Sequence, residues 1–162
     1  MITITLDDAA VRAVLQDLQR RLGNLTPAMA QIGEALAEGS KQRIEQGRDW
    51  RGQPFAPNKP STLARKKGAR PLIDTGTLLH NRIHSSADAS SATVGAGGVQ
   101  AAVMQFGQKK GASGAGRRGR PIPWGDIPPR PFLPISPGGD LEPKARDLVL
   151  DILRAWVADA GG

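Results

Sequence analysis

The chain has 162 residues, and its 39% hydrophobic and 23% charged content is that of a single globular domain. A net charge of +7 raises the question of a polyanionic partner, and the absence of cysteine excludes disulfides and thiolate metal sites. No apolar run approaches the ~20 residues that a membrane span needs, and the first residues lack a signal-peptide pattern. We therefore expect no membrane contact and a protein that is assembled in the cytoplasm.

The first third of the chain predicts one strand and two helices. Isoleucine alternates with threonine at the N-terminus, which is the pattern of a short strand over residues 2–6. An aspartate cap and Gly23 then bracket an amphipathic helix. A Thr-Pro cap at Thr26 opens a second helix that ends at Gly47.

The middle of the chain is irregular and locally basic. Residues 48–60 are rich in Gly, Pro and Asn and predict a loop that lays Trp50 and Phe55 on the domain, with a brief helical turn after Ser61. A compact positive cluster follows, formed by Arg65, Lys66, Lys67 and Arg70. The run of Asp74, Thr75 and Gly76 then predicts a capped turn.

A hairpin is predicted from residues 80–86 and 92–96, because a short polar turn sequence separates them. Residues 101–106 fit either a short helix or a strand. A basic loop, Gly107 to Arg120, follows and holds no apolar residue larger than alanine. We expect residues 107–121 to form a mobile loop, because glycine and charge give it little to bury.

A proline-clamped apolar segment, Ile127 to Ile135, comes next. Its four prolines lack amide donors, so it fits only an edge strand or a polyproline-like conformation. The apolar side chains of Phe132 and Leu133 must be covered by the chain's own helices or by a neighbouring subunit. Residues 136–140 form a break that ends in an aspartate cap, and a strongly amphipathic helix starts at Leu141.

These elements predict an α+β fold in one domain, residues 1–162. A small mixed or antiparallel sheet is packed by two N-terminal helices and one C-terminal helix, and the long basic loop is flexible.

The sequence offers little catalytic chemistry. No nucleophile elbow is visible, and the glycines at 95, 97 and 98 do not form a phosphate-binding fingerprint. His80 and His84 lie four residues apart and could supply two zinc ligands, but no third ligand is suggested nearby. We therefore expect no enzyme, no cofactor, and no catalytic, cofactor-binding or metal-binding residues.

The basic loop has three possible roles. It could neutralise DNA phosphates, it could be a solvated insertion, or it could order against an acidic neighbouring protein. The last two are favoured together, since no recognition helix or aromatic stacking platform accompanies the arginines. Arg130, held between prolines, suits a carboxylate contact between subunits. It equally fits a lone exposed arginine on an edge strand.

Three ordered segments resemble the phage virion morphogenesis family, which includes the tail completion protein of P2-like phages and the G protein of Mu-like phages. The segments are residues 72–78 (LIDTGTL), 102–107 (AVMQFG) and 127–133 (IPPRPFL). The resemblance extends loosely over most of the chain. The long basic insertion between Gly107 and Pro121 departs from the compact pattern, so nothing is carried over to its residues.

The resemblance implies a non-enzymatic structural protein that completes the tail or joins it to the head, with tail, neck or connector proteins as partners. It also implies a homo-oligomeric ring, a place in the virion at the head–tail junction or tail end, and assembly in the host bacterial cytoplasm. By similarity, Asp74, Thr75 and Gly76 anchor the fold. The predicted contact surface comprises Lys109, Lys110, Arg117, Arg118, Arg120, Arg130, Phe132 and Leu133. The alternative is a small basic DNA-binding protein with non-specific DNA contact.

Overall fold

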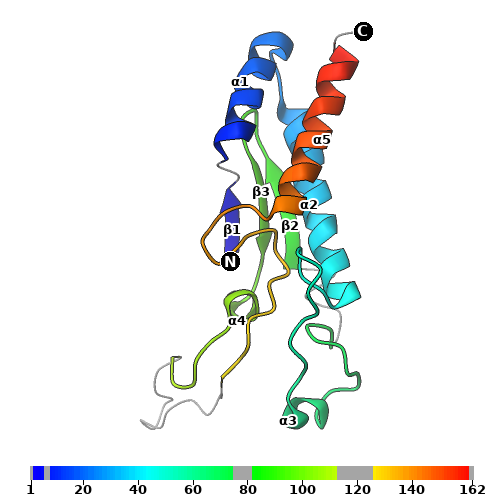
Figure 1. The fold of residues 1–162 in the computed structure, drawn as a ribbon, viewed down its shortest axis with the longest axis vertical. Helices are drawn as coiled ribbons and strands as arrows, with labels where there is room; N and C mark the ends of the chain where they lie inside the picture. The colour runs from blue at the N-terminus through cyan, green and yellow to red at the C-terminus, as the bar shows by residue number, and fades with distance from the viewer. Residues whose placement is uncertain (1, 6–7, 75–81, 113–125, 161–162) are drawn as a thin grey trace.

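A three-stranded antiparallel sheet in the order β1-β3-β2 lies at the middle of the molecule (Figure 1). The computed structural model describes residues 2–5, 8–74, 82–112 and 126–160. β1 (Ile2–Thr5) and β2 (Ile83–Ala87) both pair with β3 (Ala92–Ala96), so that Ala96 stands between Ile2 and Ile83. The predicted N-terminal strand and the hairpin are confirmed.

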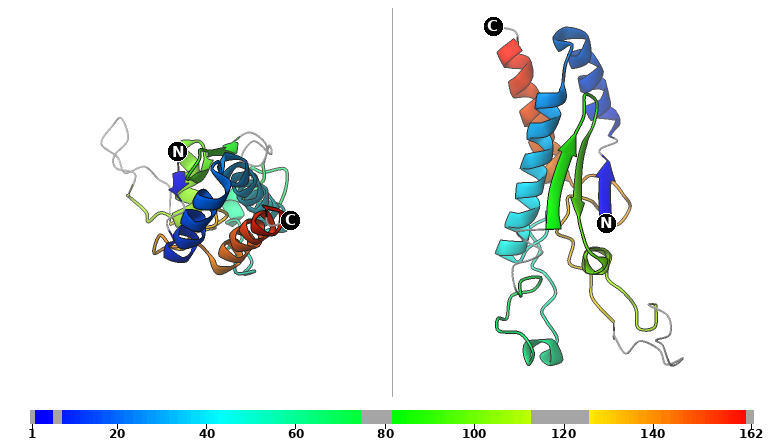
Figure 2. Two further views of the ribbon diagram at one scale, coloured as in Figure 1. Left: turned by 90° about the horizontal axis from the view of Figure 1, so that it is seen from above. Right: turned by 180° about the vertical axis from the view of Figure 1, so that it is seen from behind.

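Three long helices cover one face of this sheet, as the view from above shows (Figure 2). They are α1 (Ala9–Leu22), α2 (Thr26–Gln46) and α5 (Pro143–Ala160). α2 packs on β2, β3 and α5, and α5 also packs on α1. The indole Nε1 of Trp156 donates to Gln31 Oε1 at 2.7 Å, which joins the end of α5 to the beginning of α2. The predicted α+β fold, with N-terminal and C-terminal helices packed on a sheet, is confirmed.

The core lies between α2, the sheet and α5. Its fully buried side chains include Ile32 and Ile44 of α2, Val94 of β3, and Val149 and Leu153 of α5. A Cβ on Gly33 would lie 3.2 Å from Ser85 Cβ, so this glycine lets α2 approach β2 closely. Several inward residues of β2 and β3 are small, namely Ser85, Ala87, Ala92 and Ala96, which suits so close an approach.

The helix boundaries follow the sequence signals with two corrections. Gly23 and Gly47 end α1 and α2 with positive φ values of 68° and 67°, a conformation that glycine adopts readily. Thr26 does not cap α2, since its own amide donates to Asn24 Oδ1 at 3.0 Å. The last helix begins at Pro143 rather than directly after Asp140.

Two short helices lie nearer the other end of the molecule. α3 (Pro60–Leu63) is the brief turn predicted after the Trp50 loop, and α4 (Val99–Phe106) settles the helix-or-strand choice as a helix. Two loop regions extend from the body at this end (Figures 1 and 2). One is residues 56–73, which we call the α3 arm. The other spans residues 107–129 and contains the basic loop; the structure describes its residues 107–112 and 126–129. No helix of the described residues is long and apolar enough to cross a membrane.

Of the two conformations predicted for residues 127–135, the edge strand is excluded, because this segment joins no strand of the sheet. It makes only isolated bridges, from Ile127 to Gln108 and from Ile135 to Leu141. The physical reason is the proline spacing, which removes four of the amide donors that a sheet ladder needs. The segment is extended, as the sequence required, and lies beside α4.

Candidate functional site

The proline segment is held in place by one buried glutamine of α4. Gln105 is 2% exposed, and its Oε1 accepts from the amides of Phe132 and Leu133 at 3.0 Å each. The amide of Arg130 donates to Met104 O at 2.7 Å. The side-chain oxygen of Gln105 therefore accepts the hydrogen bonds that the carbonyls of a neighbouring strand would accept in a sheet. The sequence analysis missed this role, although a lone glutamine among apolar residues in 102–107 was the available signal.

The side chains of Phe132 and Leu133 are both fully buried, and their cover comes from the chain's own core. The indole Nε1 of Trp50 donates to Phe132 O at 3.0 Å, which attaches the 48–55 loop to the same segment. The Trp50 ring lies over Gly39 of α2, where an added Cβ would come within 2.6 Å of the ring. The structure thus places Phe132 and Leu133 inside the chain instead of on the predicted contact surface.

The second and third segments of the sequence pattern touch each other at Gly107. This residue has φ = 74°, and an added Cβ would lie 2.8 Å from Ile127 O and 2.9 Å from Pro129. The amides of Gln108 and Ile127 each donate to the other's carbonyl, at 2.9 and 2.7 Å. The end of the 102–107 segment and the start of the 127–133 segment therefore form one unit, which closes the base of the basic loop.

Arg130 makes an internal contact rather than the predicted contact between subunits. Its Nε donates to Ala56 O at 2.7 Å and its Nη2 to Pro57 O at 2.9 Å, and the residue is 6% exposed. Burial lowers the pKa of this guanidinium. Arg130 follows the basic loop in the chain, and Ala56 and Pro57 begin the α3 arm, so this side chain ties the two loop regions together.

An ion pair fixes the 48–55 loop to the start of α5. Arg51 Nε lies 3.1 and 3.0 Å from the two carboxylate oxygens of Glu142, which is 5% exposed. The hydrogen bond to Glu142, with its charge, raises the pKa of the Arg51 guanidinium. This contact has a structural role, because the carboxylate is paired with Arg51 through both of its oxygens.

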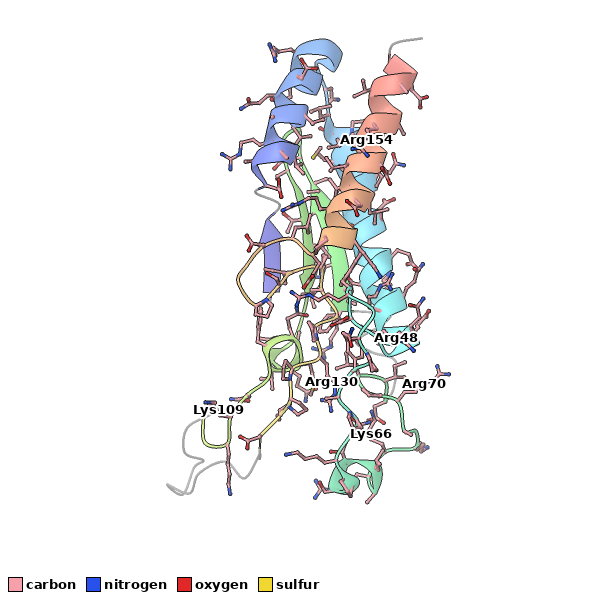
Figure 3. All side chains as sticks on the ribbon, in the orientation of Figure 1. Arg48, Lys66, Arg70, Lys109, Arg130 and Arg154 are labelled. Atoms are coloured by element: carbon pink, nitrogen blue, oxygen red, sulfur yellow. The ribbon has the colours of Figure 1, made fainter. Side chains whose placement is uncertain are left out.

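Positive charge collects at the end that carries the two loop regions. The α3 arm has five basic residues and no acidic one, and residues 107–129 have five basic residues and one acidic residue. The rest of the chain has twelve basic and fourteen acidic residues, so the two loop regions account for the whole net positive charge. Figure 3 places Lys66, Arg70 and Lys109 at this end and Arg154 towards the other. We call this region the basic end.

The described part of the basic loop is exposed and anchored at its base. Lys109 and Lys110 are both exposed, and the amide of Lys110 donates to Asp126 Oδ1 at 2.9 Å. Arg117, Arg118 and Arg120, which belong to the predicted contact surface, lie outside the described residues. Mobility of residues 107–121 stays a prediction.

The turn predicted at Asp74 is only partly described. Asp74 is exposed, and Thr75 and Gly76 lie outside the described residues. Just before it, Leu72 has φ = 63°, a conformation that is uncommon for a residue other than glycine, and it packs against the core with Ile73. The role of these residues as a fold anchor stays a prediction.

The described residues do not assemble a group of side chains that could hold a metal. His84 is exposed on β2, with its Nδ1 3.3 Å from Arg82 O, and His80 lies outside the described residues. No group of three or more His, Cys, Asp or Glu side chains capable of holding a metal occurs in the part of the chain that the structure describes. Among the described residues, no third ligand therefore supports the hypothesis of a zinc site at His80 and His84.

The structure thus defines a small α+β protein whose net positive charge comes from its two loop regions. The family model of the phage virion morphogenesis family matches residues 6–158, and the chain belongs to this family. Family membership supports a structural or assembly role in a bacteriophage and association with the virion. No curated protein matches the chain significantly, and no solved structure does so either.

Proposed function

We propose that this protein completes the phage tail or joins it to the head, as a non-enzymatic component of the neck or tail end. The match of the family over residues 6–158 carries the proposal. Lys109 and Lys110 of the basic loop add support, because both are exposed and offer positive charge to a partner surface. The partners would be tail and neck or connector proteins, and several copies would form a ring.

The proposed contact surface is narrower than the sequence predicted. Phe132, Leu133 and Arg130 serve the chain's own interior. Lys109 and Lys110 are exposed. We propose that they form the contact surface together with Arg117, Arg118 and Arg120 of the same loop. This loop would dock on a neighbouring protein of the virion, where acidic groups would offset its charge.

The experiment that tests the role is deletion of the gene from its parent phage or prophage, followed by electron microscopy of the induced lysate. Filled heads beside separate tails would support the joining or completion role. Aberrant tail ends would place the protein on the tail side. Intact, infectious particles at normal yield would overturn the proposal.

A second experiment tests the contact surface. Changing Lys109, Lys110, Arg117, Arg118 and Arg120 together to serine should abolish docking and leave the fold intact, because Lys109 and Lys110 are exposed and the sequence from Gly107 to Arg120 holds no apolar residue larger than alanine. Virion yield from a complemented deletion measures docking, and the melting temperature of the purified variant checks the fold. Normal yield would remove the loop from the contact surface.

A further inference from the structure

The α3 arm is a second concentration of positive charge that the joining role does not use. Four of its five cations are exposed and the fifth, Lys66, is half-buried. No acidic residue occurs between positions 56 and 73. The five are Lys59, Arg65, Lys66, Lys67 and Arg70.

These cations are not neutralised within the described chain. The ion pairs of the described residues lie elsewhere, at α1, α2, α5 and the 48–55 loop, and none involves the α3 arm. Five like charges on eighteen residues repel one another, which favours occupation by a polyanion.

The arm is also ordered before any ligand binds. Asn58 Nδ2 donates to Ala69 O at 3.0 Å across the arm, and Lys66 Nζ donates to Arg70 O at 3.0 Å. The buried guanidinium of Arg130 holds the root through Ala56 O and Pro57 O. A preformed array of cations loses less conformational freedom on binding than a free loop does.

The surface of the arm suits nucleic acid better than protein. Leu63, 42% exposed, is the one exposed large apolar side chain on the arm. The centre of a specific protein–protein contact is usually apolar and depleted of charge. Protein–DNA contacts are polar, wet and strongly positive. The excess of acidic residues in the rest of the chain would turn a polyanion toward the basic end.

We infer that the α3 arm binds the phosphate backbone of duplex DNA, without reading its sequence. The contact needs only cations on phosphates, so it requires no recognition helix in a groove. Lys109 and Lys110 lie at the same end of the molecule and would extend the positive surface. This inference does not depend on the joining role, since DNA binding by the purified chain is measured without virions.

The test is the salt dependence of binding to a fluorescent 30-base-pair duplex of random sequence, measured by anisotropy with the full chain. Five phosphate contacts give a slope of log K against log salt of about −4.5, or about 500-fold weaker binding at 200 mM than at 50 mM salt. The arm variant K59A/R65A/K67A/R70A keeps Lys66, whose ammonium has an internal partner. Its slope should be smaller in magnitude by about 3.6.

The matched control removes four exposed cations outside the basic end: R12A/R20A/K144A/R154A. It has the same net charge as the arm variant, and its salt slope should equal that of the unchanged protein. Equal loss of slope in both variants would overturn the inference, because bulk charge would then explain binding. Failure of the unchanged protein to bind duplex at 50 mM salt would also overturn it. If the unchanged protein does not bind DNA and the arm variant does not support virion assembly, the arm binds an acidic protein surface instead.

Discussion

In the body of this protein, α2 and α5 bury Ile32, Ile44 and Val149 completely, whereas no residue of the α3 arm from 56 to 73 is buried. The body carries slightly more acid than base, and the basic end carries the whole net positive charge. The stability of the body thus comes from apolar burial, whereas the positive charge is concentrated at the basic end, where little apolar surface is buried. This separation lets the basic end change its sequence without cost to the core.

Apolar packing of Leu72 and Ile73 on the core and several polar contacts join the two regions. Gln105 and the backbone of 130–133 attach the proline segment to α4, and Arg130 attaches the α3 arm to that segment. Trp50 adds a bond from the 48–55 loop. Among the contacts that orient the arm on the body, these hydrogen bonds can each be tested by substitution.

The largest effect is expected from Phe132→Ala. Phe132 is fully buried, so its truncation leaves a cavity and should lower the free energy of unfolding by about 3–5 kcal/mol. Phe106→Ala is the matched control, because that ring is 50% exposed and its loss should cost within about 0.5 kcal/mol. Urea denaturation measures both. Equal midpoints for the two variants would remove Phe132 from the core and return it to the contact surface.

Gln105→Leu should come next, at about 2–4 kcal/mol. Leucine fills the space but removes the acceptor of two buried amides, which are then left without partners. Gln16→Leu on the exposed face of α1 is the control and should change stability by about 0.5 kcal/mol or less. A stability equal to that of the unchanged protein would show that the proline segment is held by its side chains alone.

Arg130→Met should have a smaller global effect, about 1–2 kcal/mol, because the loss of two hydrogen bonds is partly offset by removing a buried charge. Its local effect should appear as faster proteolysis of the arm. Tryptic cleavage within the arm, between Lys59 and Arg70, should become about tenfold faster, as expected if opening of the arm root becomes easier by about 1.4 kcal/mol.

The control for this prediction is Arg154→Met, an exposed arginine of α5 that lies away from the basic end. Its rate of cleavage within the arm should match that of the unchanged protein. Unchanged cleavage in the Arg130 variant would mean that the arm is ordered by its own contacts, such as the bond from Asn58 to Ala69.

Much of the body could be predicted from the sequence, because periodicity and local caps decide it. The alternation at residues 2–5, the glycines at 23 and 47, and the turn of the 83–96 hairpin are all short-range signals. The cap of α2 was misplaced because Thr26 is a good capping residue by type, whereas the structure makes it the first helical residue and puts Leu25 at the N-cap position.

The proline segment could not be predicted fully, because its partners lie more than twenty residues away in the chain. Prolines correctly excluded a central strand, but no local pattern shows that a glutamine side chain replaces the ladder. Likewise Arg130 fitted an external carboxylate as well as two internal carbonyls, since a guanidinium serves either. Long-range side-chain bonds of this kind also explain why segments 102–107 and 127–133 occur together.

The smallest effect concerns the hairpin turn at the end of the body away from the arms. The Oδ1 of Asp88 accepts from the amides of Ser90 and Ser91 and from the Ser90 hydroxyl, and its Oδ2 accepts from the Ser91 hydroxyl. The hydrogen bond from the Ser90 amide, followed by the other three, lowers the pKa of this carboxyl to about 2 from 3.8.

Because the folded pKa is the lower one, the stabilisation from Asp88 is complete above the unfolded pKa and is lost as pH falls from about 4 through about 2. An NMR titration of the Asp88 carboxyl carbon should show a midpoint near pH 2. S90A/S91A removes both hydroxyl donors and keeps both amides, so its midpoint should lie between 2 and 3.8. A midpoint near 3.8 in the unchanged protein would mean that this turn is not held by its aspartate. The hairpin turn would then lack this local stabilisation. The contrast between the body and the two loop regions would depend on the apolar core alone.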